Sequence, residues 1–184
     1  MSLFEFVLTG FTLVLALVIT RVLGGLRWVL AAGRVYWVHA TFVFVLLVFA
    51  SLVWWELWYQ RNNQWNYLSF AYNLLIGPGV MYFISVLLVP EQPRRITNWR
   101  AYFYAVRRMF YGTLAGMMIA AFIGAIGITH TQLGHPGQAL MAFGLLLAVL
   151  GYRSESHAMH AGIAVVLATL VAIAVALVQT APVR

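Results

Sequence analysis

The chain has 184 residues, of which 64% are hydrophobic and 8% charged, and its mean hydropathy is +0.90. Soluble domains carry about a quarter charged residues, so this composition excludes an ordinary soluble protein and predicts an integral membrane protein. Cysteine is absent, which excludes disulfides and thiolate metal sites, and the net charge of +7 rests on arginine because lysine is absent as well.

The apolar runs are continuous and do not alternate, which predicts transmembrane helices and not a barrel. A membrane-spanning helix needs about 20 apolar residues. We therefore predict an all-α, polytopic membrane protein, a bundle of about six transmembrane helices forming a single domain over residues 1–184. The predicted spans lie near 3–23, 35–59, 66–89, 101–129, 137–152 and 157–180. The fifth is short and is open to an alternative, a re-entrant element. The first begins at Leu3 without a basic region or cleavage site, so we expect a retained span.

The arginines predict the orientation of the bundle. With six spans, nine of them fall on one side: Arg21, Arg27, Arg34, Arg94, Arg95, Arg100, Arg107, Arg108 and Arg153. Only Arg61 and Arg184 fall on the other side. Because positive charge is retained in the cytoplasm, both termini are predicted outside it, in a bacterial inner membrane.

The first two spans carry polar residues at helical spacing. Glu5, Thr9 and Thr12 share one face of the first helix and are candidates for a polar path. The second span ends in WWELW, which is typical of an aromatic belt at the membrane interface. Glu56 lies inside this belt, and an ionisable residue there is a second candidate for the path.

The third span contains the stretch IGPGV, in which Pro78 removes one helical hydrogen bond. We expect a break or kink there. Broken helices line binding sites in some transporters, and Asn73, one turn away, joins the candidate path. The alternative is a purely structural kink satisfied by neighbouring helices.

The stretch 93–111 opens the fourth span and is strongly basic. Thr97 or Asn98 is expected to cap the helix, which places Arg100, Tyr104 and Arg107 on one face. One interpretation is contact with anionic lipid headgroups on the cytoplasmic side, and the other is a site for an acidic or phosphorylated ligand between helices. The candidate residues are Arg94, Arg95, Arg100, Arg107 and Arg108.

Small residues recur every four positions in two spans, which predicts close helix packing, either within the chain or between subunits. The two series are Gly112, Gly116, Ala120 and Gly124, and Ala164, Ala168, Ala172 and Ala176.

Histidines are the only candidate ligands for a haem, a pigment or a metal. His157 and His160 lie one turn apart at the start of the last span, and His39 opens the second, all on the predicted cytoplasmic side. They are candidate cofactor ligands, although interfacial histidines are commonly just solvated and no complete metal motif accompanies them. His130 and His135 are predicted on the opposite side.

The stretches TRVLGGL (20–26), WWELW (54–58), Pro78 and Pro90 in P-x(11)-P spacing, and NWRAYFYAVRRMFY (98–111) follow one another in this order. This order resembles a group of small multi-helix bacterial inner-membrane proteins that has no established activity. The resemblance covers roughly the first two-thirds of the chain. It departs at Val106, where the group has asparagine, and at Glu56, where a small or uncharged residue is usual. It implies a membrane bundle and no catalytic residues.

Neither a Gly-x-Ser-Gly setting nor an HExxH motif is present, which argues against rhomboid-type and zinc-dependent proteolysis. An intramembrane acid acting with His39 stays open, because sequence does not show proximity. Two non-enzymatic interpretations remain. The first is an accessory or scaffold subunit of a larger assembly, such as a photosynthetic or respiratory complex. The alternative is a homo-oligomeric ion channel or small-solute carrier. The expected partners are membrane lipids and other membrane subunits or further copies, and not nucleic acid.

Overall fold

The computed structural model describes residues 3–31, 33–59, 61, 66–127, 132–134 and 136–180. Within these ranges the chain is helical and contains no strand, which confirms the predicted all-α bundle. The long helices are α1 (Leu3–Val29), α2 (Trp37–Tyr59), α5 (Trp99–Gly127), α6 (Pro136–Arg153) and α7 (His157–Thr180). The third predicted span is divided into α3 (Tyr67–Leu74), a π-helical turn η1 (Leu75–Gly79) and α4 (Val80–Leu88), and a 3-10 turn η2 (Pro93–Arg95) follows. Arg184, His130 and His135 lie outside the described residues.

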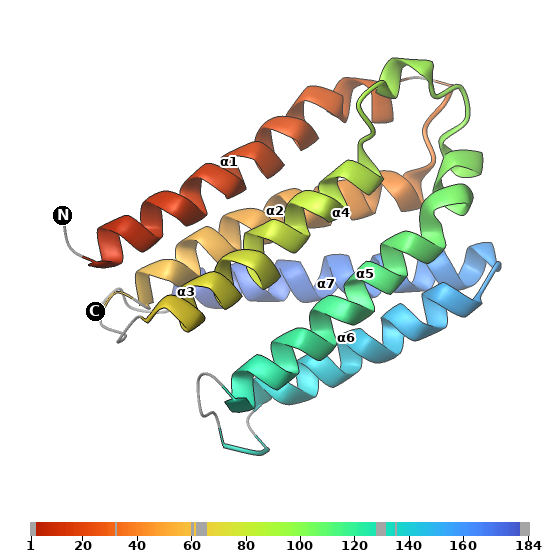
Figure 1. The fold of residues 1–184 in the computed structure, drawn as a ribbon. Helices are drawn as coiled ribbons and strands as arrows, with labels where there is room; N and C mark the ends of the chain where they lie inside the picture. Colours follow the sequence, from red (N-terminus) through yellow and green to blue (C-terminus); the bar gives the residue numbers. More distant parts are fainter. Residues whose placement is uncertain are drawn as a thin grey trace.

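Five described segments are long and apolar enough to cross a membrane: Leu3–Val29, Trp37–Trp58, Tyr67–Arg95, Trp99–Gly127 and His157–Val178. The fifth predicted span, 137–152, corresponds to α6, whose 18 residues give it a length of about 27 Å. This helix lies alongside α5 and returns the chain to the end where α5 begins (Figure 1). The close approach of α5 and α6 depends on Gly151, because a Cβ atom there would lie 2.3 Å from the Tyr111 ring.

The expected break at Pro78 takes the form of the π-helical turn between α3 and α4. Proline has no N–H to donate, so the regular hydrogen-bond ladder cannot continue through this residue. A wider turn is a common way to absorb such an interruption. The side chain of Pro78 is buried, and the turn packs against α1 and α5. Neighbouring helices therefore enclose the break.

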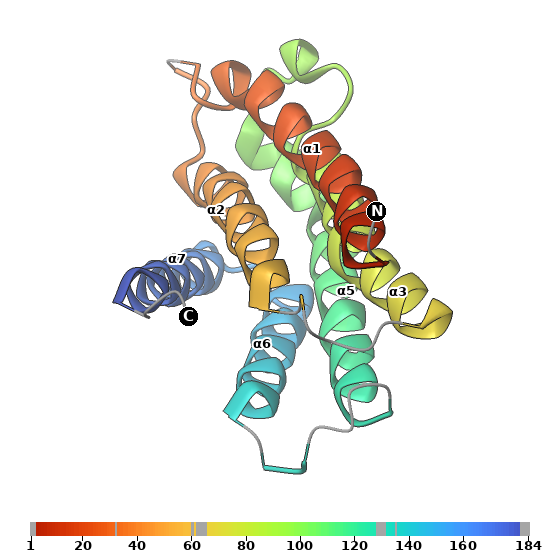
Figure 2. The same cartoon turned by 90° about the vertical axis from the view of Figure 1, so that its left-hand side faces the viewer.

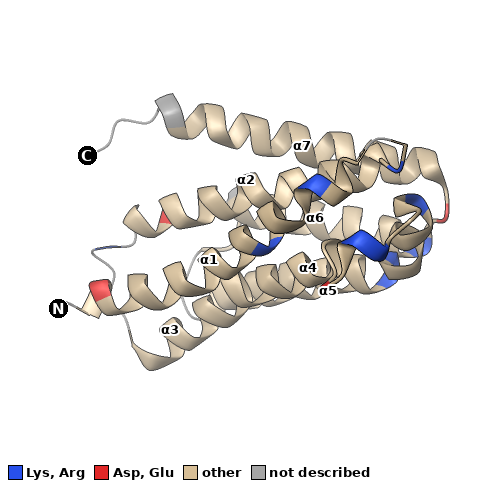
Figure 3. Ribbon diagram, turned by 90° about the horizontal axis from the view of Figure 1, so that it is seen from above, with Lys and Arg blue, Asp and Glu red and all other residues tan. Residues whose placement is uncertain are grey.

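The nine arginines that were assigned to one side belong to the later part of α1, the α1–α2 connection, η2, the first part of α5 and the last residue of α6. Figure 3 shows the blue segments gathered toward one end of the bundle, which we call the arginine end. The start of α1 and the far part of α7 lie at the opposite end (Figure 1). The largest fully buried side chains concentrate near the arginine end, among them Trp99, Phe103 and Tyr111 of α5. Helix α7 packs mainly on α2 and stands to one side of the remaining helices (Figure 2).

Candidate functional site at the arginine end

The carboxyl end of α4 is held by side chains from three other helices. Helix α4 ends at Leu88, and Pro90 prevents its continuation, so its last carbonyls have no partner within the helix. Each of three neighbouring helices supplies one donor. The bonds run from Tyr102 Oη to the Leu87 carbonyl (2.9 Å), from His39 Nε2 to the Leu88 carbonyl (3.0 Å) and from Arg21 Nε to the Val89 carbonyl (2.8 Å). These bonds tie α1, α2 and α5 to a single helix terminus.

His39 therefore takes part in packing and in a hydrogen bond between helices. Its ring is fully buried and stacks on Trp99 with 4.9 Å between the ring centroids. Trp99 in turn donates from Nε1 to the carbonyl of Trp28 at 2.9 Å, which satisfies an acceptor near the end of α1. Because His39 Nε2 faces a carbonyl oxygen, this nitrogen must carry the proton. The ring binds the backbone of α4, and the rings of Trp99, Tyr102 and Phe103 lie next to it.

His157 and His160 each bind a tyrosine from another part of the bundle. The Tyr36 hydroxyl lies 2.9 Å from His157 Nδ1, and the Tyr111 hydroxyl lies 3.1 Å from His160 Nδ1. The rings of Tyr111 and His160 are also stacked, with centroids 5.5 Å apart. These two bonds fix the first turn of α7 against the rest of the bundle.

The structure does not bring the three candidate histidines to a common point. The ring of Phe103 neighbours two of them, with its centroid 6.1 Å from that of His39 and 5.2 Å from that of His160. Within the described ranges, no group of three or more histidine and carboxylate side chains is close enough to hold a metal ion. A cofactor held jointly by the three histidines has no support in this geometry.

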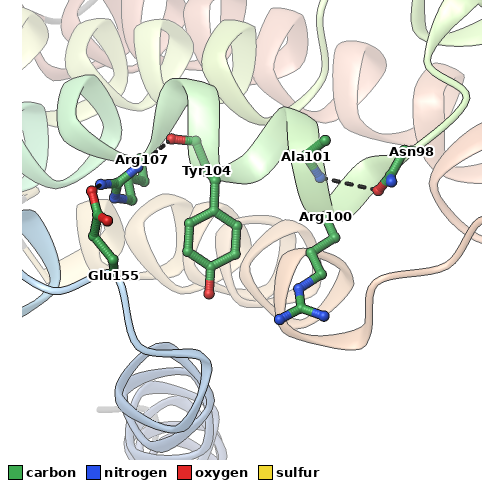
Figure 4. Close-up of a pocket in the computed structure, with 6 residues that line it drawn as sticks. All are labelled: Asn98, Arg100, Ala101, Tyr104, Arg107 and Glu155. Atoms are coloured by element: carbon green, nitrogen blue, oxygen red, sulfur yellow. Dashed lines mark hydrogen bonds and ion pairs between the residues drawn. The ribbon is translucent and has the colours of Figure 1, made fainter.

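A pocket of about 510 Å³ opens at the surface of the arginine end. It is lined by Asn98, Arg100, Ala101, Tyr104, Arg107 and Glu155. The expected N-cap is confirmed, because Asn98 Oδ1 accepts a hydrogen bond from the N–H of Ala101 at 3.0 Å. The cap sets the register in which Arg100, Tyr104 and Arg107 project from the same side of α5 (Figure 4). The predicted common face of these three residues is thus the wall of the pocket.

The two arginines of the pocket differ in their surroundings. Arg107 is 9% exposed, forms an ion pair with Glu155 of the α6–α7 connection, and donates from Nη1 to the Tyr104 carbonyl at 2.8 Å. Arg100 is exposed and has no ion-pair partner among the described residues. It lies near the phenol of Tyr36, whose pKa is raised above its ordinary value by burial and by Tyr104, while Arg100 opposes this rise.

The remaining predicted basic residues do not enter this pocket. Arg94, Arg95 and Arg108 are exposed and do not line it, and Arg34 and Arg153 are exposed as well. The described carboxylates at this end are Glu91 and Glu155. The arginine end therefore carries the excess positive charge of the molecule.

The residues proposed for a polar path face outward. Glu5, Thr9 and Thr12 are exposed on α1, opposite the buried face that includes Val7 and Phe11. Thr9 donates to the carbonyl of Glu5, and Thr12 accepts from Trp54 Nε1 at 3.2 Å. Glu56 is also exposed, and Asn73 donates to the Ser69 carbonyl of its own helix. Within a single chain these side chains do not enclose a path.

The two series of small residues have different neighbours. On α5, Gly112 lies beside Tyr152 of α6, while Gly124 is buried against the ring of Tyr72, whose hydroxyl donates to the Ala120 carbonyl. Gly116 has no atom near the position of a Cβ. On α7, Ala164 is buried and Ala168 half-buried, whereas Ala172 and Ala176 are exposed.

Several residues of this site were not predicted from the sequence. Three of these residues bind groups that are distant in the sequence, namely Tyr36, Tyr111 and Glu155. No local sequence motif predicts such pairs. One feature of the sequence could have indicated the capped end of α4. Pro90 ends a helix, and the last carbonyl groups of a helix need hydrogen-bond donors from elsewhere.

A scan against protein-family models and searches of curated proteins and of solved structures each found no match.

Proposed function

We propose that the chain is a non-enzymatic membrane protein that serves as an accessory or scaffold subunit of a larger assembly in a bacterial inner membrane. The observation that carries the proposal is the outward orientation of the polar side chains of α1 and α2. Thr12 and Trp54 are hydrogen-bonded on the outer surface, Glu5 and Thr9 share the face of α1 that carries Thr12, and Glu56 is exposed on α2 about 200° around the helix from Trp54. We call these five residues the polar strip.

Polar groups on an outer helix face are costly in lipid and favourable against another protein. A charged residue in a transmembrane helix is expected to face a bundle interior, a cavity or a partner. Hydroxyl and carboxylate groups contribute hydrogen bonds between helices where lipid offers none. A partner helix on the strip would therefore remove this cost, and the exposed Ala172 and Ala176 of α7 would allow a second close approach.

The test is the subunit composition of the complex extracted from native membranes in a mild detergent. We expect a second membrane protein to co-elute in fixed stoichiometry, and we expect Thr12→Val combined with Glu56→Gln to abolish co-elution. The control is Thr113→Val, because Thr113 is a half-buried threonine of α5 whose hydroxyl donates to the Met109 carbonyl of its own helix at 2.8 Å. The control should leave the complex intact. Loss of the partner in both variants, or in neither, would contradict the role of the strip.

The alternative, a homo-oligomeric channel or carrier, is favoured by the same strip if copies of this chain face one another across a pore. It predicts a homo-oligomer without other subunits that conducts ions in liposomes, with a conductance that falls in Glu56→Gln.

The absorption spectrum of the native complex tests for a cofactor. A colourless complex would argue against haem or pigment at His39, His157 and His160, whereas a haem or chlorophyll band would support these residues as candidate ligands.

The proposed orientation has its own test, because the chain contains no cysteine. Glu91→Cys introduces one exposed thiol at the arginine end, and Leu68→Cys introduces one on exposed α3 near the opposite end. With the arginine end in the cytoplasm, a membrane-impermeant maleimide added to intact spheroplasts should label Leu68→Cys alone. The reverse labelling would overturn the proposed orientation.

A further inference from the structure

We propose that the pocket formed by Arg100, Tyr104 and Arg107 is a binding site for a phosphate group, carried by a lipid headgroup or by a soluble phosphate. This site is separate from the polar strip, which lies on other helices. An experiment that contradicted the proposed subunit role would therefore not contradict this site.

The charges of the pocket are unbalanced in favour of an anion. Two guanidinium groups line it, and only one carboxylate, that of Glu155, belongs to the same wall. The pocket also lies at the first turns of α5, where the helix dipole adds about half a positive charge. An anion with one or two negative charges would neutralise this excess, and a phosphate ester has that charge at neutral pH.

The pocket also has the donors that a phosphate requires. Arg100 is exposed and holds no ion pair within the described ranges, so its fork of N–H groups is available to a ligand. Arg107 is nine-tenths buried, and its Nε has no hydrogen-bond partner in the part of the chain that the structure describes. Guanidinium groups match phosphate oxygens in pairs of parallel hydrogen bonds. The pocket volume of about 510 Å³ falls in the range of small-ligand sites.

Glu155 is the counter-ion of Arg107 within the chain. Its carboxylate pairs with Arg107, yet its side chain is 74% exposed and belongs to the short connection between α6 and α7. An ion pair with one exposed partner contributes little stability, so an entering phosphate can take its place. Glu155 thereby lowers the affinity for anions, and its removal should raise it. A merely structural ion pair would not produce this effect.

Figure 4 shows how the side chains that line the pocket are arranged. Arg100 and the Arg107–Glu155 pair lie at two sides of Tyr104, whose hydroxyl points in the direction in which Arg100 extends. A phosphate between the two guanidinium groups would replace the Glu155 carboxylate and come within reach of the phenol. The position at the end of a membrane bundle suits a headgroup, and the open mouth of the pocket also admits a free anion.

The experiment uses the full chain in two formats. In neutral detergent, native mass spectrometry measures the retention of phosphatidic acid relative to phosphatidylcholine. In phosphatidylcholine nanodiscs, calorimetric titration measures the binding of inorganic phosphate and of pyrophosphate. The variants are Arg100→Gln and Glu155→Gln, both at exposed positions, and the matched control is Arg108→Gln, an exposed arginine one residue beyond the pocket.

We expect Arg100→Gln to weaken binding roughly tenfold, because a charge-assisted hydrogen bond contributes about that much. Glu155→Gln should strengthen binding severalfold, and Arg108→Gln should change it by less than about twofold because its charge is screened. Binding of the lipid alone with this pattern assigns the site to a headgroup, and binding of the soluble anions with this pattern assigns it to a free phosphate. Equal effects of Arg100→Gln and Arg108→Gln, or no binding in either format, would overturn the proposal.

Discussion

The two ends of the bundle are held together in different ways. At the arginine end, side chains cross from one helix to the backbone or side chain of another, as in the three donors to α4, the Trp99 bond to α1 and the two tyrosine–histidine pairs. At the opposite end, several polar side chains bond within their own helix, as Thr9 and Asn73 do. The bonds between helices there include Trp54 to Thr12 and Tyr72 to Ala120. The comparison indicates that the arginine end fixes the fold, while the opposite end leaves polar groups on the surface.

The largest difference between the ends is expected for tryptophan. Trp99 is completely buried, so Trp99→Ala should lower the free energy of unfolding by about 3–5 kcal/mol. Trp58, at the opposite end, is 48% exposed, and Trp58→Ala should cost less than about 0.5 kcal/mol. Circular dichroism during unfolding by dodecyl sulfate in mixed micelles measures both. Equal losses in the two variants would show that the ends contribute alike.

The next largest effect is expected for two neighbouring glycines of α1 at the arginine end. A Cβ at Gly25 would lie 2.1 Å from Val89 Cγ1, and Val89 is buried, so Gly25→Ala should destabilise the fold by about 1–3 kcal/mol. No atom occupies the corresponding space at exposed Gly24. Gly24→Ala should therefore stabilise α1 by about 0.5–1 kcal/mol through helix propensity. The same unfolding assay measures both variants. If the free energy of unfolding changed in the same direction in both, α1 and the end of α4 would not be in close contact.

The smallest effect is expected for the tyrosine that caps α4. Tyr102→Phe removes the hydrogen bond to Leu87 and should cost about 1 kcal/mol, because interhelical bonds in membranes are individually modest. Tyr82→Phe is the control, since Tyr82 is 37% exposed. We expect the control to unfold like the unmodified chain. Should Tyr102→Phe also be neutral, the capping of α4 would contribute to geometry but not to stability.

The sequence predicts the helices well because their cause is local. Apolar length, the proline at position 78 and the cap at Asn98 are each readable within a few residues, and the structure confirms them. The common face of Arg100, Tyr104 and Arg107 follows from helix periodicity alone. These predictions needed no knowledge of which helices are neighbours.

The remaining features depend on tertiary neighbours. The placement of Glu155 opposite Arg107 requires α6 to return along α5 before the chain turns into α7. Phe103 of α5 is a ring neighbour of both His39 of α2 and His160 of α7, which lie far apart in the sequence. The outward direction of Glu5, Thr9 and Thr12 depends on which face of α1 the other helices cover. A single helix pattern contains none of this information, so the sequence alone could not place these side chains relative to one another.

The gathering of nine arginines at one end restricts the symmetry of any self-assembly. We expect a chain with so strong a bias to insert in one orientation, because reversing it would carry these guanidinium groups across the hydrocarbon layer. In the proposed orientation, two copies would therefore stand parallel to each other. A twofold or higher rotation axis between them must run along the membrane normal, and an inverted, antiparallel pair with its axis in the membrane plane is excluded on these grounds.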